Sequence, residues 1–388
     1  MRKVLFIAYD FPPGAGIGGG LRSGSFARYL PEFGWQPRVL ALDSGQAGIE
    51  SVTRLASKTP WHWPYELTPY GWAYSLARHL RGLEETFDLV YVSCPPFPQA
   101  LVAAQFAARS NIPLVVDFRD AWSLDPYQEG STLKRLLYRY LFPLLERRLV
   151  SATDLLILNT PSSLRAYQAL FPAYQSRMVW LSNGFDEQGF PSVLPQVHGD
   201  ELLLRYVGRF GIGARSPNNL LSALALAHQR GCKVRLEIFG DQSLAVLAQI
   251  ASHGLGGLVT VKPQVEYLEA VNIMCQAGVL VLMQAPTTAK VQAVAGKTFD
   301  YLRAGRPILY VGPEGDNADL VKTYACCCRC SVDEPSRIAD AIELLYGQWR
   351  QGEFAQACTK PGQIKHFERR ELTKRLADMF SQLAGRAS

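Results

Sequence analysis

The sequence predicts an α/β protein made of two doubly wound domains, each with its own parallel sheet. Short apolar runs alternate with helix-length segments along all 388 residues, and strands separated by helices indicate βαβ units. The chain is also too long for one ordinary core, so two domains are expected. The runs predicted as strands are residues 4–8, 38–42, 89–93, 114–118, 155–158, 178–181, 202–207, 233–239, 258–261, 278–283 and 307–311.

Composition narrows the functional classes. The formal net charge of +6 suits an anionic substrate or an anionic membrane surface, and it is too small to indicate nucleic-acid binding. No window approaches eighteen uninterrupted apolar residues, so no membrane span is expected. The first apolar run ends at Asp10 after only a few residues, which is typical of a buried strand rather than of a signal peptide. A cytoplasmic protein is therefore expected.

Four of the eight cysteines lie within residues 326–330. A metal site is one interpretation of this cluster. However, no second pair of cysteines at finger spacing and no histidine cluster accompany it. We interpret these cysteines as small apolar residues beside a short strand, and no metal is expected.

A glycine-rich loop follows the first predicted strand and leads into a helix. Gly14, Gly16 and Gly19 match the spacing of the dinucleotide fingerprint, but two prolines precede them and Asp43 stands in a Ser/Gly loop, so this match is weak. Backbone N–H groups in such a loop can approach an anion at the start of the helix. A purely structural turn is the alternative.

The second half carries two further candidates for phosphate binding. A glycine loop at Gly208 contains Arg209 and Arg215, which can make paired, charge-assisted bonds to phosphate oxygens. Lys297 stands at the start of a predicted helix with Asp300 about one turn later, so both side chains can face one ligand. A cation for phosphate and a carboxylate for ribose suit a nucleotide; a solvated lysine on a surface helix is the alternative.

Residues 297–309, which read Lys-Thr-Phe-Asp-Tyr-Leu-Arg-Ala-Gly-Arg-Pro-Ile-Leu, resemble the Lys-x-Phe-Glu-Tyr-Leu-Ala-x-Gly-x-Pro signature of the retaining, GT-B-fold glycosyltransferases of family 4. Four more stretches resemble that family in the same order: residues 87–96, 112–122, 182–186 and 206–217. The resemblance implies two Rossmann-like domains facing across a cleft, residues 1–185 on the acceptor side and 186–360 on the donor side. Residues 361–388 would form a helix returning to the first domain.

The resemblance also implies roles for individual residues. Arg215 or Arg209, together with Lys297, would neutralise the leaving diphosphate, and Asp300 would bind the ribose. Arg119 and Asp120 match a His-Asp or Arg-Asp pair beside the transferred sugar. The implied donor-binding residues are Gly18, Gly19, Gly208, Arg209, Arg215, Val265, Lys297, Thr298, Phe299 and Asp300; the implied catalytic residues are Arg215, Lys297, Asp120 and Arg119.

The expected activity is transfer of a sugar from a nucleoside-diphosphate donor to a saccharide or lipid-linked acceptor. The expected course is retention, without a metal or a further cofactor, in the biosynthesis of a bacterial surface polysaccharide. Two departures from the family, Gln292 in place of a Glu and Arg119 in place of a His, affect the sugar end of the site. A catalytically silent binding subunit and a transferase for small-molecule acceptors are the alternatives.

Two segments bear on contact with the inner face of the membrane. From Ser131 to Val150 an apolar face is expected at Leu133, Leu136, Leu137, Tyr140 and Leu144, opposite most of the basic residues. This face either packs on the sheet or meets the headgroups. The aromatic segment from Trp61 to Trp72 either packs in a loop or contacts acceptor or membrane.

Overall fold

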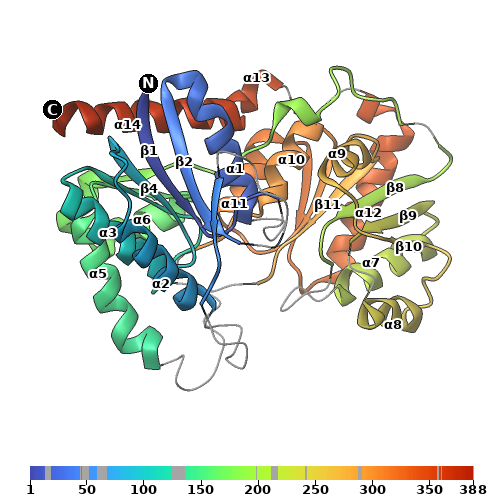
Figure 1. The fold of residues 1–388 in the computed structure, drawn as a ribbon. Helices are drawn as coiled ribbons and strands as arrows, with labels where there is room; N and C mark the ends of the chain where they lie inside the picture. Colours follow the sequence, from blue (N-terminus) through green and yellow to red (C-terminus); the bar gives the residue numbers. More distant parts are fainter. Residues whose placement is uncertain are drawn as a thin grey trace. The chain divides into compact units, whose positions relative to one another are not determined.

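Two parallel β-sheets form the centres of two units of the chain (Figure 1). The first unit comprises Met1–Gly184, Ala289–Ala293 and Arg369–Ser388, and the second comprises Phe185–Thr288 and Val294–Glu368. The computed structural model describes residues 1–13, 19–43, 45, 52–58, 68–124, 136–197, 199–210, 217–240, 243–286, 291–355, 358–359 and 361–387.

The sheet of the first unit has seven strands in the order β3-β2-β1-β4-β5-β6-β7. All neighbouring strands are parallel, as predicted from the alternation of strands and helices. Its strands are β1 (Arg2–Ala8), β2 (Trp35–Leu42), β3 (Val52–Leu55), β4 (Leu89–Cys94), β5 (Leu114–Phe118), β6 (Leu155–Leu158) and β7 (Met178–Trp180).

Helices cover both faces of this sheet, because its strands are apolar on both sides. On one face, α2, α3, α5 and α6 enclose a core that contains Trp72, Phe118 and Tyr167. On the other face, α1 and α14 pack together over Phe6 and Tyr91. The helices of the first unit are α1 (Gly19–Tyr29), η1 (Leu30–Phe33), α2 (Thr68–Arg81), α3 (Pro98–Ser110), the π-helical turn η3 (Leu137–Leu141), α5 (Phe142–Ala152), α6 (Pro161–Leu170), η4 (Pro172–Arg177) and α14 (Arg369–Ala387).

The helix expected to return to the first domain is α14. Leu372, Leu376 and Phe380 recur at a helical spacing and are completely or almost completely buried in the core of the first unit. The rings of Phe380 and Trp35 pack edge to face, with their centroids 5.4 Å apart. The last residues of the chain are therefore part of the first unit.

The sheet of the second unit has six parallel strands in the order β10-β9-β8-β11-β12-β13. Its strands are β8 (Leu202–Val207), β9 (Val234–Phe239), β10 (Val259–Lys262), β11 (Val279–Met283), β12 (Ile308–Val311) and β13 (Cys327–Cys330). Its helices are η5 (Glu187–Gly189), α7 (Asn218–Gln229), α8 (Leu244–Ser252), α9 (Tyr267–Cys275), α10 (Gly296–Ala304), α11 (Asp316–Tyr324), α12 (Pro335–Arg350), η6 (Glu353–Ala355), α13 (Pro361–Ile364) and η7 (Lys365–Phe367).

The strand order places the candidate sites. In each sheet the direction of winding reverses beside the strand that begins the unit: at β1 and β4 in the first, and at β8 and β11 in the second. Ligands of doubly wound folds bind beyond the carboxyl ends of the strands at this point. The residues that follow β1, β4 and β8 are therefore expected to contribute to a ligand-binding site.

Candidate active site

The carboxyl edge of the first sheet joins four residues from separate segments. Arg119, which follows β5, donates from Nη2 to Oδ2 of Asp10 at 3.2 Å and to the carbonyl oxygen of Pro95 at 3.0 Å. Gly19 begins α1 beside this ion pair; a Cβ atom there would lie 2.5 Å from Arg119 Nη1 and 2.5 Å from Asp10 Oδ2. Of the implied residues, Gly19 and Arg119 are thus neighbours, whereas Gly18 lies outside the described residues.

The backbone of Arg119 is held from both sides. Its N–H donates to the carbonyl oxygen of Cys94 at 2.8 Å, and its own carbonyl oxygen accepts from the side chain of Asn159. Arg119 Nε is buried and has no hydrogen-bond partner among the described residues. The next residue, Asp120, is exposed. The end of β5 is therefore followed by an arginine held in position, Arg119, and directly after it by an exposed carboxylate, Asp120.

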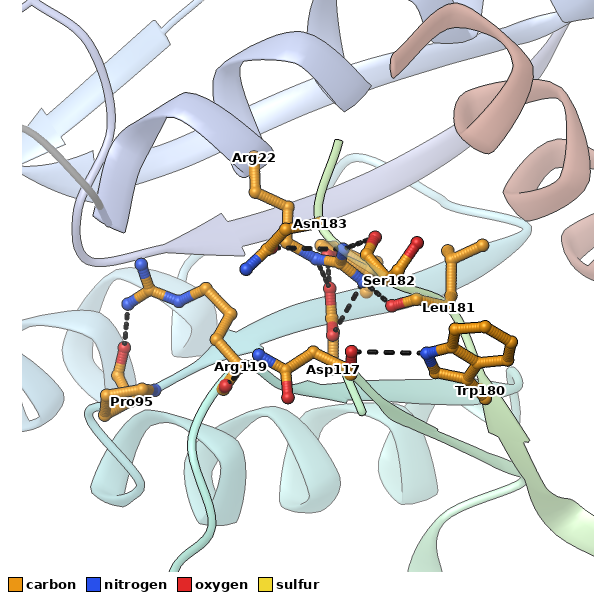
Figure 2. A network of polar contacts seen from close by, with 10 residues as sticks. Arg22, Pro95, Asp117, Arg119, Trp180, Leu181, Ser182 and Asn183 are labelled. Carbon is orange, nitrogen blue, oxygen red and sulfur yellow. Dashed lines mark hydrogen bonds and ion pairs between the residues drawn. The ribbon is translucent and has the colours of Figure 1, made fainter. Parts of the chain in front are cut away.

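Behind this edge lies a buried network centred on Arg22 (Figure 2). Arg22 Nε donates to Oδ2 of Asp117 at 2.8 Å, and the exposed fractions of the two side chains are 5% and 0%. Arg22 also donates to the carbonyl oxygens of Leu181, at 2.9 Å, and of Ser182. Tyr91 donates to the same carboxylate oxygen at 2.6 Å. This network ties the start of α1 to β4, β5 and the segment after β7.

The ionisation states in this network follow from its electrostatics. Burial disfavours a charged guanidinium, but attraction to Asp117 outweighs that cost and raises the pKa of Arg22. Burial, together with the Asp117 carboxylate, raises the pKa of Tyr91 well above its ordinary value. Arg22 is therefore a cation and Tyr91 a neutral donor at physiological pH.

The sequence motifs did not predict Asp10, Arg22, Tyr91 or Asp117 as site residues. One signal was available: Asp117 interrupts the apolar run of β5, and a charged residue within a buried strand requires a partner. The identity of that partner was hidden, because Arg22 is 95 residues away in the chain.

The carboxyl edge of the second sheet holds Lys297 against β8. Lys297 Nζ donates to the carbonyl oxygen of Val207 at 3.1 Å and lies 3.5 Å from the centroid of the Tyr206 ring. Tyr301, one turn further along α10, accepts from the backbone N–H of Val207 at 3.0 Å. These contacts are with neutral groups, so they orient the ammonium group without cancelling its charge.

The glycines at the ends of β8 and β9 permit a close approach of two backbones. Gly208 has φ +116°, and a Cβ atom there would lie 3.6 Å from Lys297 Nζ. A Cβ atom on Gly240 would lie 2.1 Å from the carbonyl oxygen of Gly208. Arg209 is exposed and Val265, after β10, is half-buried. The structure thus brings Gly208 and Lys297 together, while Arg215 lies outside the described part of the chain.

The remaining implied residues of α10 face inward. Thr298 and Phe299 are buried: Thr298 Oγ1 donates to Oδ1 of Asn317 at 2.8 Å, and Phe299 packs on Phe367. Asp300 is 6% exposed, and its Oδ1 accepts from Tyr267 at 2.8 Å. Thr298 and Phe299 could therefore meet a ligand only through the backbone at the start of the helix, and Tyr267 is an additional residue that the sequence did not indicate.

Gln292, the first of the two departures, lies in the short segment that belongs to the first unit. Its backbone N–H donates to Oγ of Ser162 at 3.0 Å, next to the buried side chain of Val291. The Gln292 backbone is thus anchored at the start of α6.

The cysteine-rich segment forms β13, an edge strand paired with β12. Nowhere in the described part of the chain do three His, Cys, Asp or Glu side chains gather as metal ligands would. Among the same residues, no helix combines the length and the apolar character required to cross a membrane.

The segment before and within α5 exposes apolar side chains. The exposed fractions are 49% for Leu136, 60% for Tyr140 and 67% for Leu144, so of the two alternatives, packing on the sheet does not apply to these three residues. The segment packs instead through Leu149 and Val150. Exposed basic residues accompany the apolar row: Arg139, Arg147 and Arg148. Leu133 lies outside the described residues.

The aromatic segment from Trp61 to Trp72 is described only at its end. Trp72 belongs to α2 and is completely buried, with its ring at the edge of Tyr9 at a centroid distance of 5.5 Å. Residues 61–67 lie outside the described residues. At Trp72 the aromatic ring belongs to the core.

Comparison with known proteins agrees with this architecture. Residues 18–184 match the family of the glycosyl transferase 4-like domain. No curated protein sequence matches the chain. Among solved structures, the chain is similar to sucrose-phosphate synthase from Thermosynechococcus elongatus, with a TM-score of 0.73 and 15% identity over 100% of both chains.

Two further solved structures share the fold. WaaG, a glycosyltransferase involved in lipopolysaccharide biosynthesis, has a TM-score of 0.72 and 17% identity over 97% of this chain and 99% of that one. HepE from Anabaena, in complex with UDP and glucose, has a TM-score of 0.65 and 16% identity over 99% of this chain and 100% of that one. At these identities the likeness establishes the GT-B fold.

Proposed function

We propose that the chain is a GT-B-fold glycosyltransferase of family 4 and that it moves a sugar from a nucleoside-diphosphate donor to a saccharide or lipid-linked acceptor. The observation that carries this proposal is the cationic group at the switch point of the second sheet. There Lys297 stands at the start of a helix, beside Gly208. Because Gly208 has no side chain, a ligand can approach its backbone closely. Helix starts and lysine both attract phosphate.

The leaving group explains why this arrangement suits sugar transfer. When the bond between the sugar and the diphosphate breaks, negative charge develops on the diphosphate, and a preorganised cation stabilises that charge best. Lys297 is preorganised by the Val207 carbonyl and the Tyr206 ring. We propose that Lys297, with Arg209 or Arg215, neutralises the diphosphate, and that Asp300 accepts hydrogen bonds from the ribose. Binding of UDP by HepE supports a nucleoside diphosphate as the leaving group.

We assign the sugar end of the reaction to the first unit. Arg119 and Asp120 follow β5, and the Asp10 carboxylate fixes the orientation of the arginine. The proposed stereochemical course is retention, with leaving group and acceptor on the same face of the sugar. No nucleophile is assigned, and the charge on the diphosphate is neutralised by Arg and Lys rather than by a metal ion.

The acceptor is proposed to be presented at the inner face of a membrane. The segment exposes a row of apolar side chains, Leu136, Tyr140 and Leu144, with arginines beside it. This combination is typical of segments that lie on an anionic lipid surface. The solved structure of WaaG, described as acting in lipopolysaccharide biosynthesis, supports a role in making a bacterial surface polysaccharide. The protein would then be a cytoplasmic enzyme in peripheral contact with the membrane.

A donor panel tests the activity. Release of nucleoside diphosphate from UDP-, GDP- and TDP-sugars is measured for the wild type, for Lys297→Ala and for Lys322→Ala, an exposed lysine on α11. We expect turnover with at least one donor, a loss of roughly 100-fold or more in Lys297→Ala, and no change in Lys322→Ala. No turnover with any donor, together with no thermal stabilisation by any nucleoside diphosphate, would rule out the enzyme and favour a silent binding subunit.

Cosedimentation with vesicles tests the membrane contact. Vesicles of phosphatidylglycerol and phosphatidylcholine are expected to bind the wild type, and binding should weaken at high salt because the arginines act through charge. Leu144→Ser should reduce binding without affecting the fold, since its side chain is 67% exposed. Equal binding of wild type and Leu144→Ser to these vesicles would contradict this part of the proposal.

A further inference from the structure

The second unit contains a cavity at the edge opposite to the donor site. Its volume is about 320 Å³, within the range of small-molecule sites. Gly278 and Arg306 precede β11 and β12, so the cavity lies at the amino ends of these parallel strands. Its lining includes Gly278, Arg306, Trp349, Arg350 and Phe354.

Arg306 supplies a buried positive charge to this cavity. The residue is only 4% exposed. Its Nε donates to the carbonyl oxygen of Cys275 at 2.8 Å, and its Nη2 donates to that of Pro195. Nη1 donates to none of the described residues, and in the described part of the chain no carboxylate forms an ion pair with Arg306. Burying a cation without an anion is costly, and burial lowers the pKa of this guanidinium.

A second guanidinium and two rings complete the lining. Arg350 ends α12; it is exposed, and within the described ranges it forms no ion pair or hydrogen bond through its side chain. Trp349 and Phe354 are half-buried and present apolar surface beside the two arginines. Two arginines can hold a phosphate through several charge-assisted bonds, and an aromatic ring can pack against a sugar or a base.

A structural role accounts for only part of these observations. The carboxyl ends of helices carry partial negative charge, so an arginine that donates to Cys275 at the end of α9 is well placed there. This role uses Nε of Arg306, but it explains neither the open cavity nor the presence of Arg350 in its wall. We propose that the cavity binds a small organic phosphate, at a site separate from that of the nucleotide donor.

Calorimetric titration tests the site. Inorganic phosphate and glucose 6-phosphate are titrated at constant ionic strength into full-length Lys297→Ala, in which the donor site is impaired. We expect one saturable site, with glucose 6-phosphate binding more tightly because its ring contacts Trp349. Absence of saturable binding would overturn the proposal. Equal affinity for the two probes would overturn the claim that the site recognises an organic phosphate rather than phosphate alone.

Substitutions locate the binding. Arg350→Ala, added to the Lys297→Ala variant, should weaken the binding of both probes at least about tenfold, because a hydrogen bond between charged groups is lost. Arg235→Ala, an exposed arginine on β9 outside the cavity, should have no effect. Arg306→Met should abolish binding but also loses the bonds to Cys275 and Pro195, so Arg350→Ala is the decisive variant. Unchanged affinity in Arg350→Ala would place the phosphate elsewhere. Donor turnover is not a readout here, so failure would leave the proposed function intact.

Discussion

The two units share a winding pattern but use charge differently at the carboxyl edges of their sheets. In the first unit, two arginines at or behind the edge are paired with carboxylates from other segments: Arg22 with Asp117, and Arg119 with Asp10. In the second, Lys297 is oriented by a carbonyl oxygen and an aromatic ring. Ion pairs between separate segments hold the first edge together, whereas a carbonyl oxygen and a ring orient the charge of Lys297 in the second. One topology can thus provide a rigid support in one unit and an anion-binding group in the other.

The largest expected effect separates the two kinds of cation. Arg22→Met leaves the Asp117 carboxylate buried without its cation and should lower the free energy of unfolding by about 3–5 kcal/mol. Lys297→Met removes a half-buried lysine and keeps an apolar side chain beside the Tyr206 ring, so it should cost less than about 1 kcal/mol. Urea denaturation measures both, and hydrogen exchange of amides in β5 and β12 assigns the loss to a unit. Equal stability of the two variants would contradict the comparison.

Glycine substitutions give a smaller effect of the same kind. In Gly240→Ala the new Cβ would meet the Gly208 carbonyl oxygen at 2.1 Å, so the backbone must move, at a cost of about 1–3 kcal/mol. In Gly19→Ala it would meet only the ends of the Arg119 and Asp10 side chains, which can turn away, so the cost should be below about 1 kcal/mol. Because that turn breaks the Arg119–Asp10 pair, Gly19→Ala should lose more activity than stability. Denaturant midpoints and donor turnover check both; a larger stability loss in Gly19→Ala would refute this.

The smallest expected effect is a difference in pH dependence between two glutamates. In the first unit, burial raises the pKa of Glu146, and hydrogen bonds from Ser123 and Tyr167 offset this only in part. Its contribution to stability is therefore present below the unfolded pKa of about 4.3 and is lost as pH rises through the folded pKa. Glu146→Gln should remove this loss.

In the second unit the sign is reversed. Burial opposes ionisation of Glu237, but hydrogen bonds from Lys262 and Arg205 outweigh it and lower the pKa of Glu237. Its contribution is present above about pH 4.3 and is lost as pH falls through the folded pKa. Urea midpoints of wild type, Glu146→Gln and Glu237→Gln between about pH 3.5 and 7 compare the two; slopes of the same sign would contradict the assignment.

The fold could be predicted from the sequence because the central strands are buried on both faces. Such strands read as continuous apolar runs, and β5, β6 and β8 lie at the predicted residues. The first missed strand, β3, is an edge strand whose residues are all half-buried, and its Val-Thr-Arg-Leu sequence lacks an apolar run. An edge strand pairs on one side only, so its sequence is less constrained and less informative.

The candidate site was less predictable than the fold. Gly208 directly follows β8 and Lys297 stands in the first turn of α10, where a local pattern and a known fold suffice to find them. The support behind Arg119 depends on contacts between distant segments, such as Arg22 with Asp117, and no local pattern encodes these. Likewise, the exposure of Leu144 could not be read from an amphipathic period, because the same period fits a face on the core or on a lipid surface.

The position of α14 has a consequence for the order of folding. Its side chains Leu372, Leu376 and Phe380 complete a core that otherwise consists of residues from the first half of the chain. During synthesis the first unit therefore cannot reach its final packing until residues 372–380 have left the ribosome, whereas the second unit has all its strands and helices by Glu368. Of the two units, the one whose sheet is synthesised earlier is thus the one whose core is completed later.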